Sequence, residues 1–360
     1  MGIKNLKFLA KFGGAVALVL ALLFFNWDRT ELENRAFVVA MGIDACEEAQ
    51  ARFKVSLSIA DTAALEKEKD GASMVRTATG QSLNHTMGQV DAGLSSKIYF
   101  GHTKAVVLGE GVLVNSDLLR EVVDSLSRNN EINIKTVVLA AEKTAAEILS
   151  AKPKEQNQVG MYLAGFYNKN DTNTAALAVK LDLEGLDSAL LSTKSVLIPK
   201  VAVGDDEEVV IGGVAAIRDF ALAGHIPEKD LGGFLWLKEN AAGAMIPIET
   251  EDGFATFLTS KSKAKIGFYE NNGLLHCRVQ IKAKGGAHGA DIRHARVFEE
   301  KIEKEIEEIF GIMQHMGVDG PNLKEELRKK ERKLFQKYES DWGEAFKNIV
   351  LQIKVDITIS

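Results

Sequence analysis

Hydrophobic positions in the first half of the chain switch repeatedly between the spacing of strands and the spacing of helices. Residues 36–44 and 52–60 are two strand-like runs joined by a short acidic turn, which predicts a β-hairpin. Further strands are predicted at residues 73–79, 103–108 and 132–140, and helices at residues 81–94, 113–127 and from 144 to just before 153. This alternation indicates a mixed sheet with helices packed on it.

The second half of the chain is rich in strands before it becomes helical. Strands are predicted at residues 209–217, 244–248, 254–259, 264–269 and 274–283, and a helix at residues 228–239. After Gly289, six apolar residues repeat at helical spacing opposite a face of Glu and Lys: Phe298, Ile302, Ile306, Ile309, Phe310 and Met313. Of these, Phe310 and Met313 are expected to face the core. A basic helix at residues 322–338 and a one-face-buried strand at residues 350–359 complete the pattern, and the predicted fold class is α+β.

Two polar stretches are the best candidates for linkers. Residues 152–173 are rich in Asn and Gln and show little periodicity, and residues 204–208 are a glycine followed by four acids. The predicted division is a signal-like segment or membrane anchor at residues 1–26, one or more N-terminal α+β domains at residues 27–195, and a C-terminal α+β domain at residues 196–360. A multi-domain ectodomain is therefore expected, and the choice between two and three domains stays open.

An uncharged apolar run precedes these elements. It occupies residues 12–25 behind Lys4, Lys7 and Lys11, and polar sequence follows it directly. A basic flank before a short hydrophobic stretch is the pattern of an export signal, with the lysines held on the cytoplasmic side. The chain after Trp27 is therefore expected to lie outside the cytoplasm.

The end of this apolar run does not look like a processing site. A cleavable signal has small residues there and a lipoprotein signal has a cysteine, whereas this chain has Leu23, Phe24, Phe25 and Asn26. The favoured interpretation is an uncleaved N-terminal anchor whose short span is helped by a snorkelling Lys11. An ordinary signal peptide with an unusual cleavage site stays open as the alternative.

Composition limits the partners of the chain. Its 360 residues are 46% hydrophobic and 26% charged, and the formal net charge is −6 with acids and bases interspersed. The sequence shows no basic stripe that would neutralise phosphates, so no nucleic-acid partner is expected, whereas a membrane surface or a protein stays open. The two cysteines, Cys46 and Cys277, lie in apolar strand-like sequence and are expected to be buried thiols.

The sequence offers no constellation for catalysis or metal binding. His276 beside Cys277, and His288 with His294, do not have zinc-ligand spacing. The glycine-rich residues 285–289 match neither a P-loop nor a dinucleotide-binding fingerprint, and they are interpreted as a strand-to-helix turn. Nucleophile-elbow and His-Glu-x-x-His motifs are missing as well. The prediction is a non-enzymatic protein with no catalytic residues, no cofactor and no metal.

Several weak motifs follow one another in a recognisable order. The N-terminal ones are Trp27, Asp28, Glu31 and Leu32 after the apolar run, Gly42, Ile43 and Asp44 in a strand, and Phe100, Gly101, His102 and Lys104 before a strand. The later ones are Asp124, Arg128, Glu131 and Ile132, the glycine-centred run 211–215, the long Glu/Lys helix, and Trp342 with Phe346 before the last strand. In this order and spacing the chain resembles the Ger(x)C family, the C subunits of spore nutrient-germinant receptors, from Trp27 to Ile359.

The resemblance implies a non-enzymatic subunit on the outer face of the spore inner membrane, with a multi-domain α+β fold and two integral-membrane partner subunits. A contact between this subunit and the small-molecule nutrient stays open. The family has no catalytic set to transfer, so six residues are family-motif positions without an assigned role: Trp27, Asp28, Glu31, Leu32, Gly101 and His102. Trp27 suits an anchor at the membrane interface, and His102 is interpreted as a turn residue with a satisfied ring.

One departure from the family pattern concerns lipidation. Family members carry a lipidated cysteine immediately before Trp-Asp, whereas this chain has Asn26, so no thioether can form. The missing acyl chains have to be replaced by an uncleaved helix or by partner contacts.

Two other function classes stay open. An extracytoplasmic solute- or peptide-binding protein would need a pocket of apolar side chains with convergent polar groups. A cell-envelope hydrolase would need carboxylates or a nucleophile that converge from separate parts of the chain. Nothing local in the sequence supports either class as well as the ordered motifs support the receptor subunit.

Overall fold

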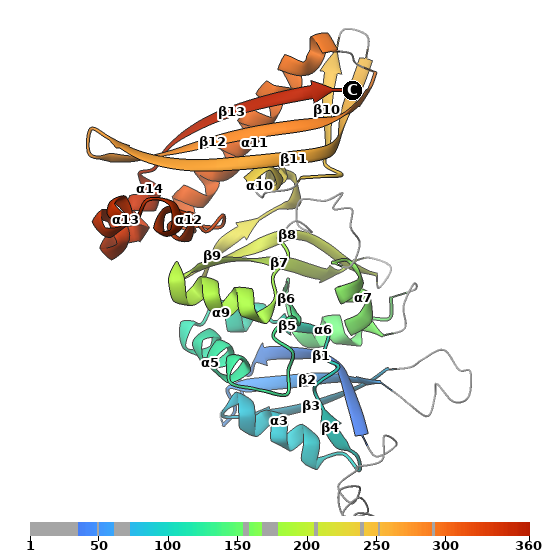
Figure 1. Cartoon of the computed structure of the whole chain (residues 1–360). Coiled ribbons are helices and arrows are strands. Elements are labelled where there is room, and N and C mark those ends of the chain that lie inside the picture. The colour runs from blue at the N-terminus through green and yellow to red at the C-terminus, as the bar shows by residue number, and fades with distance from the viewer. Residues whose placement is uncertain are drawn as a thin grey trace, which may run out of the picture.

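Two β-sheets follow one another along the molecule, and helices cover each of them (Figure 1). The computed structural model describes residues 35–48, 50–60, 73–153, 158–167, 179–204, 208–237, 241–250, 253–289 and 292–360. The first described residue, Arg35, pairs with Lys97 of strand β4 (Lys97–Tyr99), and β4 lies at the end of the molecule opposite the C-terminal sheet (Figure 1). The predicted α+β class with mixed sheets and packed helices is confirmed.

Nine of the described strands form the N-terminal sheet. They are β1 (Arg35–Ala45), β2 (Phe53–Ala60), β3 (Ser73–Gly80), β4 (Lys97–Tyr99), β5 (Ala105–Leu108), β6 (Val137–Ala141), β7 (Ser195–Val203), β8 (Val209–Arg218) and β9 (Ala221–Ile226). Their order is β3-β2-β1-β5-β6-β7-β8-β9, and β4 pairs with β1 ahead of β5. The neighbouring pairs β1–β5, β5–β6 and β6–β7 are parallel. Strands β2, β3, β8 and β9 are joined to the sheet by antiparallel pairs.

Helices cover both faces of this sheet. One face is covered by α3 (Leu83–Ala92), α4 (Glu110–Leu113), α5 (Ser116–Ser127) and α9 (Leu183–Ser192), and the other by α6 (Ala145–Ser150) and α7 (Val159–Gly165). Strands between two helical layers are buried on both sides, which is why the central strands are continuous apolar runs such as Ala-Val-Val-Leu in β5.

The predicted hairpin of residues 36–44 and 52–60 is confirmed as β1 and β2. The helix predicted at residues 113–127 is divided instead, because the Asn115 side chain accepts hydrogen bonds from two backbone N–H groups and starts α5 as its N-cap. The predicted linker at residues 152–173 contains α7 within its described part. Strands β4, β7 and β9 and helix α9 were not predicted.

The C-terminal sheet has the order β10-β11-β12-β13, with β12 and β13 parallel. Its strands are β10 (Met245–Thr250), β11 (Gly253–Asn271), β12 (Leu274–His288) and β13 (Val350–Ile359). The helical elements of this half are η2 (Glu228–Asp230), α10 (Gly232–Leu237), η3 (Ile292–His294), α11 (Ala295–Met316), α12 (Leu323–Lys330), α13 (Arg332–Tyr338), η4 (Glu339–Asp341) and α14 (Trp342–Lys347). One face of the sheet packs on α10, α11, α12 and α14 around a single apolar cluster.

The long helix after Gly289 confirms the predicted core face. All six apolar residues at helical spacing are buried in α11, Phe310 and Met313 among them. Acidic residues beside this core face have a second role, because the carboxylates of Glu299 and Glu303 accept the backbone N–H groups of Ile357 and Val355 at 2.9 and 3.2 Å. These bonds occupy donors on the outer edge of β13, so α11 both buries the sheet and closes one of its edges.

The expectations for residues 254–289 were wrong in two respects. The strands predicted at 254–259 and 264–269 are one strand, β11, with a bulge at Ser260 that shifts the register without ending the pairing. The presumed turn at residues 285–289 belongs mostly to β12. A Cβ on Gly285 would lie 2.0 Å from the Leu258 carbonyl oxygen, so glycine allows the two strands to approach beside the bulge.

The middle strands β7, β8 and β9 are shared between two apolar cores. Val196 and Ile217 face the cluster of the N-terminal sheet, whereas Leu197 and Ala216 face the cluster of the C-terminal sheet. The predicted division between residues 195 and 196 falls at the start of β7, a strand that pairs with both β6 and β8. The division stays a prediction.

Candidate functional site

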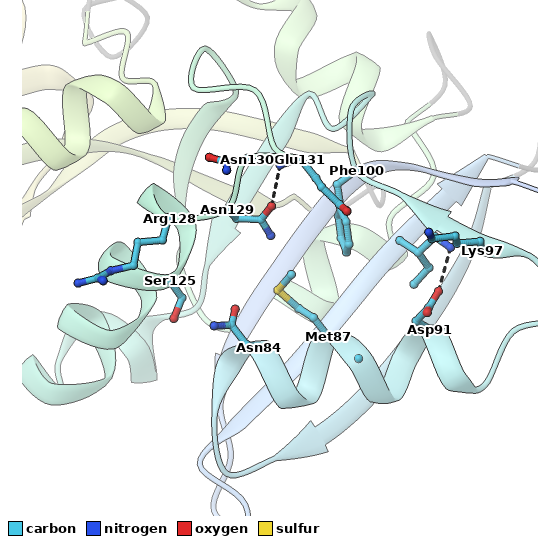
Figure 2. A pocket seen from close by; sticks show the side chains of 12 residues that line it. Asn84, Met87, Asp91, Lys97, Phe100, Ser125, Arg128, Asn129, Asn130 and Glu131 are labelled. Atoms are coloured by element: carbon cyan, nitrogen blue, oxygen red, sulfur yellow. Dashed lines mark hydrogen bonds between the residues drawn. The ribbon is translucent and has the colours of Figure 1, made fainter. Parts of the chain in front are cut away.

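A cavity of about 420 Å³ lies at the end of the N-terminal sheet, between α3, β4 and the loop that follows α5 (Figure 2). Its lining residues are Asn84, Met87, Gly88, Asp91, Lys97, Ile98, Phe100, Ser125, Arg128, Asn129, Asn130 and Glu131. An adjoining hollow of about 410 Å³ shares Lys97 and Glu131 and extends to Arg35 and Tyr99. The cavity is therefore on the end of the molecule at which the described chain begins.

The cavity has an apolar floor and a polar rim. Met87, Ile98 and Phe100 are buried and supply the floor. On the rim, the Asp91 carboxylate accepts the Ile98 backbone N–H at 2.9 Å and holds α3 against β4 (Figure 2). Such a surface suits a small amphipathic molecule or the side chain of a partner protein.

The loop after α5 forms the opposite wall of the cavity. The Asn129 side chain accepts the Glu131 backbone N–H at 2.9 Å, and Arg128 is ion-paired with Asp124 one helical turn earlier at 2.8 Å. Both charged side chains of that pair are largely exposed, so the pair contributes orientation more than stability. The loop thereby holds a fixed shape above the apolar floor.

Motif residues from separate parts of the sequence meet at this cavity. Phe100 comes from the motif before β5, and Arg128 and Glu131 come from the motif at the end of α5. Sequence reasoning missed the contributions of α3, such as Asn84, because polar residues on an amphipathic helix carry no signal of their own. The structure therefore shows that motifs separated in the sequence lie together at one cavity.

Gly101 and His102 form the turn that directly follows Phe100, and neither residue lines the cavity. A Cβ on Gly101 would lie 2.6 Å from the Tyr99 ring, so only glycine leaves that ring in place. The His102 ring packs edge-on against Phe37 and Tyr99, with ring centroids at 5.3 and 5.6 Å. Trp27, Asp28, Glu31, Leu32 and Asn26 lie outside the described residues.

The motif around Gly42 and Asp44 has a structural role. The buried Asp44 carboxylate accepts the backbone N–H groups of Ala145 and Ala146 at 2.7 and 2.9 Å and caps α6. Burial raises the pKa of Asp44, and the two N–H donors oppose that shift. A Cβ on Gly109 would lie 2.0 Å from the same carboxylate, so the neighbouring glycine makes room for the cap.

A second buried carboxylate organises the motif at Trp342. Asp319 accepts the backbone N–H groups of Leu323 and Lys324 at 2.7 and 2.9 Å, and the Trp342 indole N–H at 3.0 Å. It thereby joins the start of α12 to α14. Burial raises the pKa of Asp319 to about 6, although these donors stabilise the carboxylate.

The cysteines differ in their surroundings. Cys277 is buried in β12, and burial raises the pKa of its thiol to about 12, so the thiol is protonated at neutral pH. Cys46 is only partly buried, which corrects the expectation, because β1 ends at Ala45 and Cys46 begins the turn to β2. In the part of the chain that the structure describes, no three His, Cys, Asp or Glu side chains are grouped to hold a metal ion. No helix among the described residues combines the length and apolarity needed to cross a bilayer.

Comparison with known proteins assigns the family. The pattern described as "Spore germination protein N-terminal domain" matches residues 28–203, and the pattern described as "Spore germination B3/ GerAC like, C-terminal" matches residues 212–360. The chain belongs to this family. The resemblance drawn from the ordered motifs is thereby confirmed, and the protein is a germinant-receptor C subunit of the GerAC-like family, which is not a known enzyme class. Membership also indicates association with the spore inner membrane.

Individual relatives of this GerAC-like protein are distant. The chain is 22% identical over 298 residues to the spore germination protein YndF of Bacillus subtilis (strain 168), covering 78% of this chain and 73% of the relative. It is 26% identical over 140 residues to the spore germination protein KC of the same organism, covering 37% of this chain and 34% of that relative. The crystal structure of the GerBC protein superposes with a TM-score of 0.59 at 18% identity, over 89% of this chain and 96% of that one, which shows a shared fold.

Proposed function

We propose that this GerAC-like protein acts as a non-enzymatic receptor subunit whose ectodomain lies on the outer face of the spore inner membrane, and that its apolar-floored cavity binds a partner receptor subunit. The observation that carries the proposal is the meeting of Phe100, Arg128 and Glu131 at one cavity on the end where the described chain begins. The proposed anchor at residues 12–25 ends ten residues before Arg35 in the sequence, which supports a position of the inner membrane near that end. Integral-membrane partners would therefore reach this cavity first.

The uncharged apolar run has a second role in the proposal. Because Asn26 stands in place of the lipidated cysteine, we propose that the mature protein keeps residues 4–25 as an uncleaved anchor and carries no diacylglycerol. Intact mass of the protein extracted from spore membranes tests this directly. A mature chain that begins near Asn26 would contradict it.

Filling the cavity is expected to abolish receptor function without unfolding the protein. Gly88 lines the cavity on the exposed side of α3, and a Cβ there meets no atom within 4 Å, so Gly88→Trp places a large ring over the floor at no cost to the core. Nutrient-triggered germination of spores carrying Gly88→Trp is expected to fall to the level of spores that lack the chain. Co-purification of two integral-membrane subunits with the tagged protein is expected to fall in parallel.

The matched control is Gly88→Ala. Alanine leaves the cavity open and raises helix propensity by about 1 kcal/mol, so it is expected to preserve germination and co-purification. An unchanged thermal unfolding temperature of both variants would show that a loss of germination arises from the blocked cavity and not from unfolding. Full germination and unchanged co-purification with Gly88→Trp would refute the cavity as a partner contact.

A further inference from the structure

The face of the C-terminal sheet that points away from its helices gathers basic side chains from three strands. Exposed cations on this open face are Lys261, Lys263 and Lys265 of β11, Arg278, Lys282 and Lys284 of β12, and Lys354 of β13. The acids of the same face, within the described residues, are Glu249 and Asp356, and Asp356 pairs with Lys354 at 3.2 Å. The helices lie on the opposite side, around Phe257 and Ile281 (Figure 1). The open face is thus strongly positive on a chain whose net charge is −6.

Sequence reasoning found no basic stripe because the lysines of β11 and β12 alternate with apolar residues and are separated along the chain. The antiparallel register brings them together, with Lys261 opposite Lys284 and Lys263 opposite Lys282. Like charges directly opposite one another weaken a sheet. Asp356 of β13 lies opposite Lys282, but in the described part of the chain none of these four lysines forms an ion pair, so an external anion would relieve their mutual repulsion.

Three large apolar side chains lie on the same open face, next to one end of the group of basic residues. Phe254 is 82% exposed, Met245 51% and Leu258 42%. Met245 lies directly opposite Leu258 in the pairing of β10 with β11. Phe254, Thr256 and Leu258 are two residues apart along β11 and therefore lie on the same face. The open face therefore combines cations with an exposed apolar patch, which is the composition of surfaces that bind at a membrane interface.

The excess of lysine over arginine on the open face favours a lipid bilayer over a protein as the partner. Six of the seven basic residues are lysines, which are depleted at protein interfaces, whereas arginine is enriched there. Lysines on a flat surface suit the diffuse attraction to anionic headgroups, worth about 1 kcal/mol per residue near the membrane. Charge and apolar exposure therefore favour lipid as the occupant.

We propose that the open face of the β10–β13 sheet binds the surface of an anionic lipid bilayer, with its lysines at the headgroups and Phe254, Leu258 and Met245 at the acyl boundary. This contact does not depend on the receptor role or on the cavity. Because the sheet is at the far end of the molecule from β4 (Figure 1), where the described chain begins, binding to the same membrane as the N-terminal segment would lay the long axis along the bilayer.

The test uses the full chain reconstituted into vesicles of phosphatidylcholine, with or without phosphatidylglycerol, that contain a spin-labelled quencher lipid. In a Cys46→Ser background, a fluorophore is attached at Gln280→Cys in the middle of the open face, or at Glu308→Cys on the exposed side of α11. Several-fold stronger quenching of the Gln280→Cys probe is expected in the phosphatidylglycerol vesicles, with loss at high salt. The Glu308→Cys probe is expected to show no such dependence.

A charge-reversal variant and its control complete the test. Lys263→Glu with Lys265→Glu is expected to abolish the quenching, while Glu at 263 faces Lys282 as an opposite-charge pair and leaves the sheet intact. Lys304→Glu with Lys333→Glu makes the same change in net charge elsewhere and is expected to leave the quenching unchanged. Equal quenching in both vesicle types, or persistence in the charge-reversed variant, would overturn the proposal. Cross-linking of the open face to a receptor subunit without lipid-dependent quenching would overturn it in favour of a protein partner.

Discussion

Replacing Asp319 by alanine is expected to lower the free energy of unfolding by about 3–5 kcal/mol, because three buried donors lose their acceptor and each costs about 1–3 kcal/mol. The N–H groups at the start of α12 and the Trp342 indole N–H are then left without an acceptor. The C-terminal core thereby loses the hydrogen bonds that connect α12 to α14. Chemical denaturation of the variant measures the change. Asp341→Ala, at an exposed position of the same region, is the control and is expected to stay near the wild-type value.

The same carboxylate predicts a pH dependence of stability. Its pKa is about 6 in the folded protein and about 4 in an unfolded chain, so the folded state binds the proton more tightly. The contribution of Asp319 to stability therefore falls as the pH rises from about 4 to about 6, by about 3 kcal/mol, and is constant above that range. The difference in unfolding free energy between the wild type and Asp319→Asn isolates this effect. A difference that does not change with pH would contradict it.

Replacing Gly233 by alanine is expected to destabilise the C-terminal half by about 3 kcal/mol or more, because overpacking against backbone cannot relax by a side-chain rotation. Gly233 in α10 packs directly on α11, and a Cβ there would lie 2.1 Å from the Glu305 carbonyl oxygen. The two helices would have to separate over the apolar cluster that they share. Thermal unfolding, followed by circular dichroism, measures the loss.

Gly311→Ala provides the matched control for this effect. Gly311 is an exposed glycine within α11, and a Cβ there meets no atom within 4 Å. The substitution is expected to raise stability by about 1 kcal/mol through helix propensity alone. Similar effects of Gly233→Ala and Gly311→Ala would show that close packing of α10 on α11 is not what requires glycine at position 233.

The sequence predicted the elements whose pattern is long and periodic. The core face of α11 and the β1–β2 hairpin follow from spacing alone, because each repeats its apolar residues over several turns or alternations. Strand β4 has only three residues and no pattern of its own, so pairing with β1 defines it. The bulge at Ser260 is equally invisible locally, since only the partner strand shows that the ladder continues.

The candidate site was predicted only in part. The ordered motifs contained Phe100, Arg128 and Glu131 but did not indicate that these residues share a cavity, because the meeting depends on the loop after α5 lying across the cavity from β4. Asp319 carried no signal, since an acid between Val318 and Gly320 looks like an ordinary turn residue until its burial is known. Long-range packing decides both features, and single-sequence patterns do not report it.

Germination of spores lacking this chain tests the receptor-subunit account most directly. The comparison is best made in a strain from which the other family members have been removed, with full-length protein restored as the complement. Loss of the response to one class of nutrients is expected, with restoration by the full chain and a retained response to a trigger that bypasses nutrient receptors. An undiminished response to every nutrient in spores lacking the chain would contradict the account.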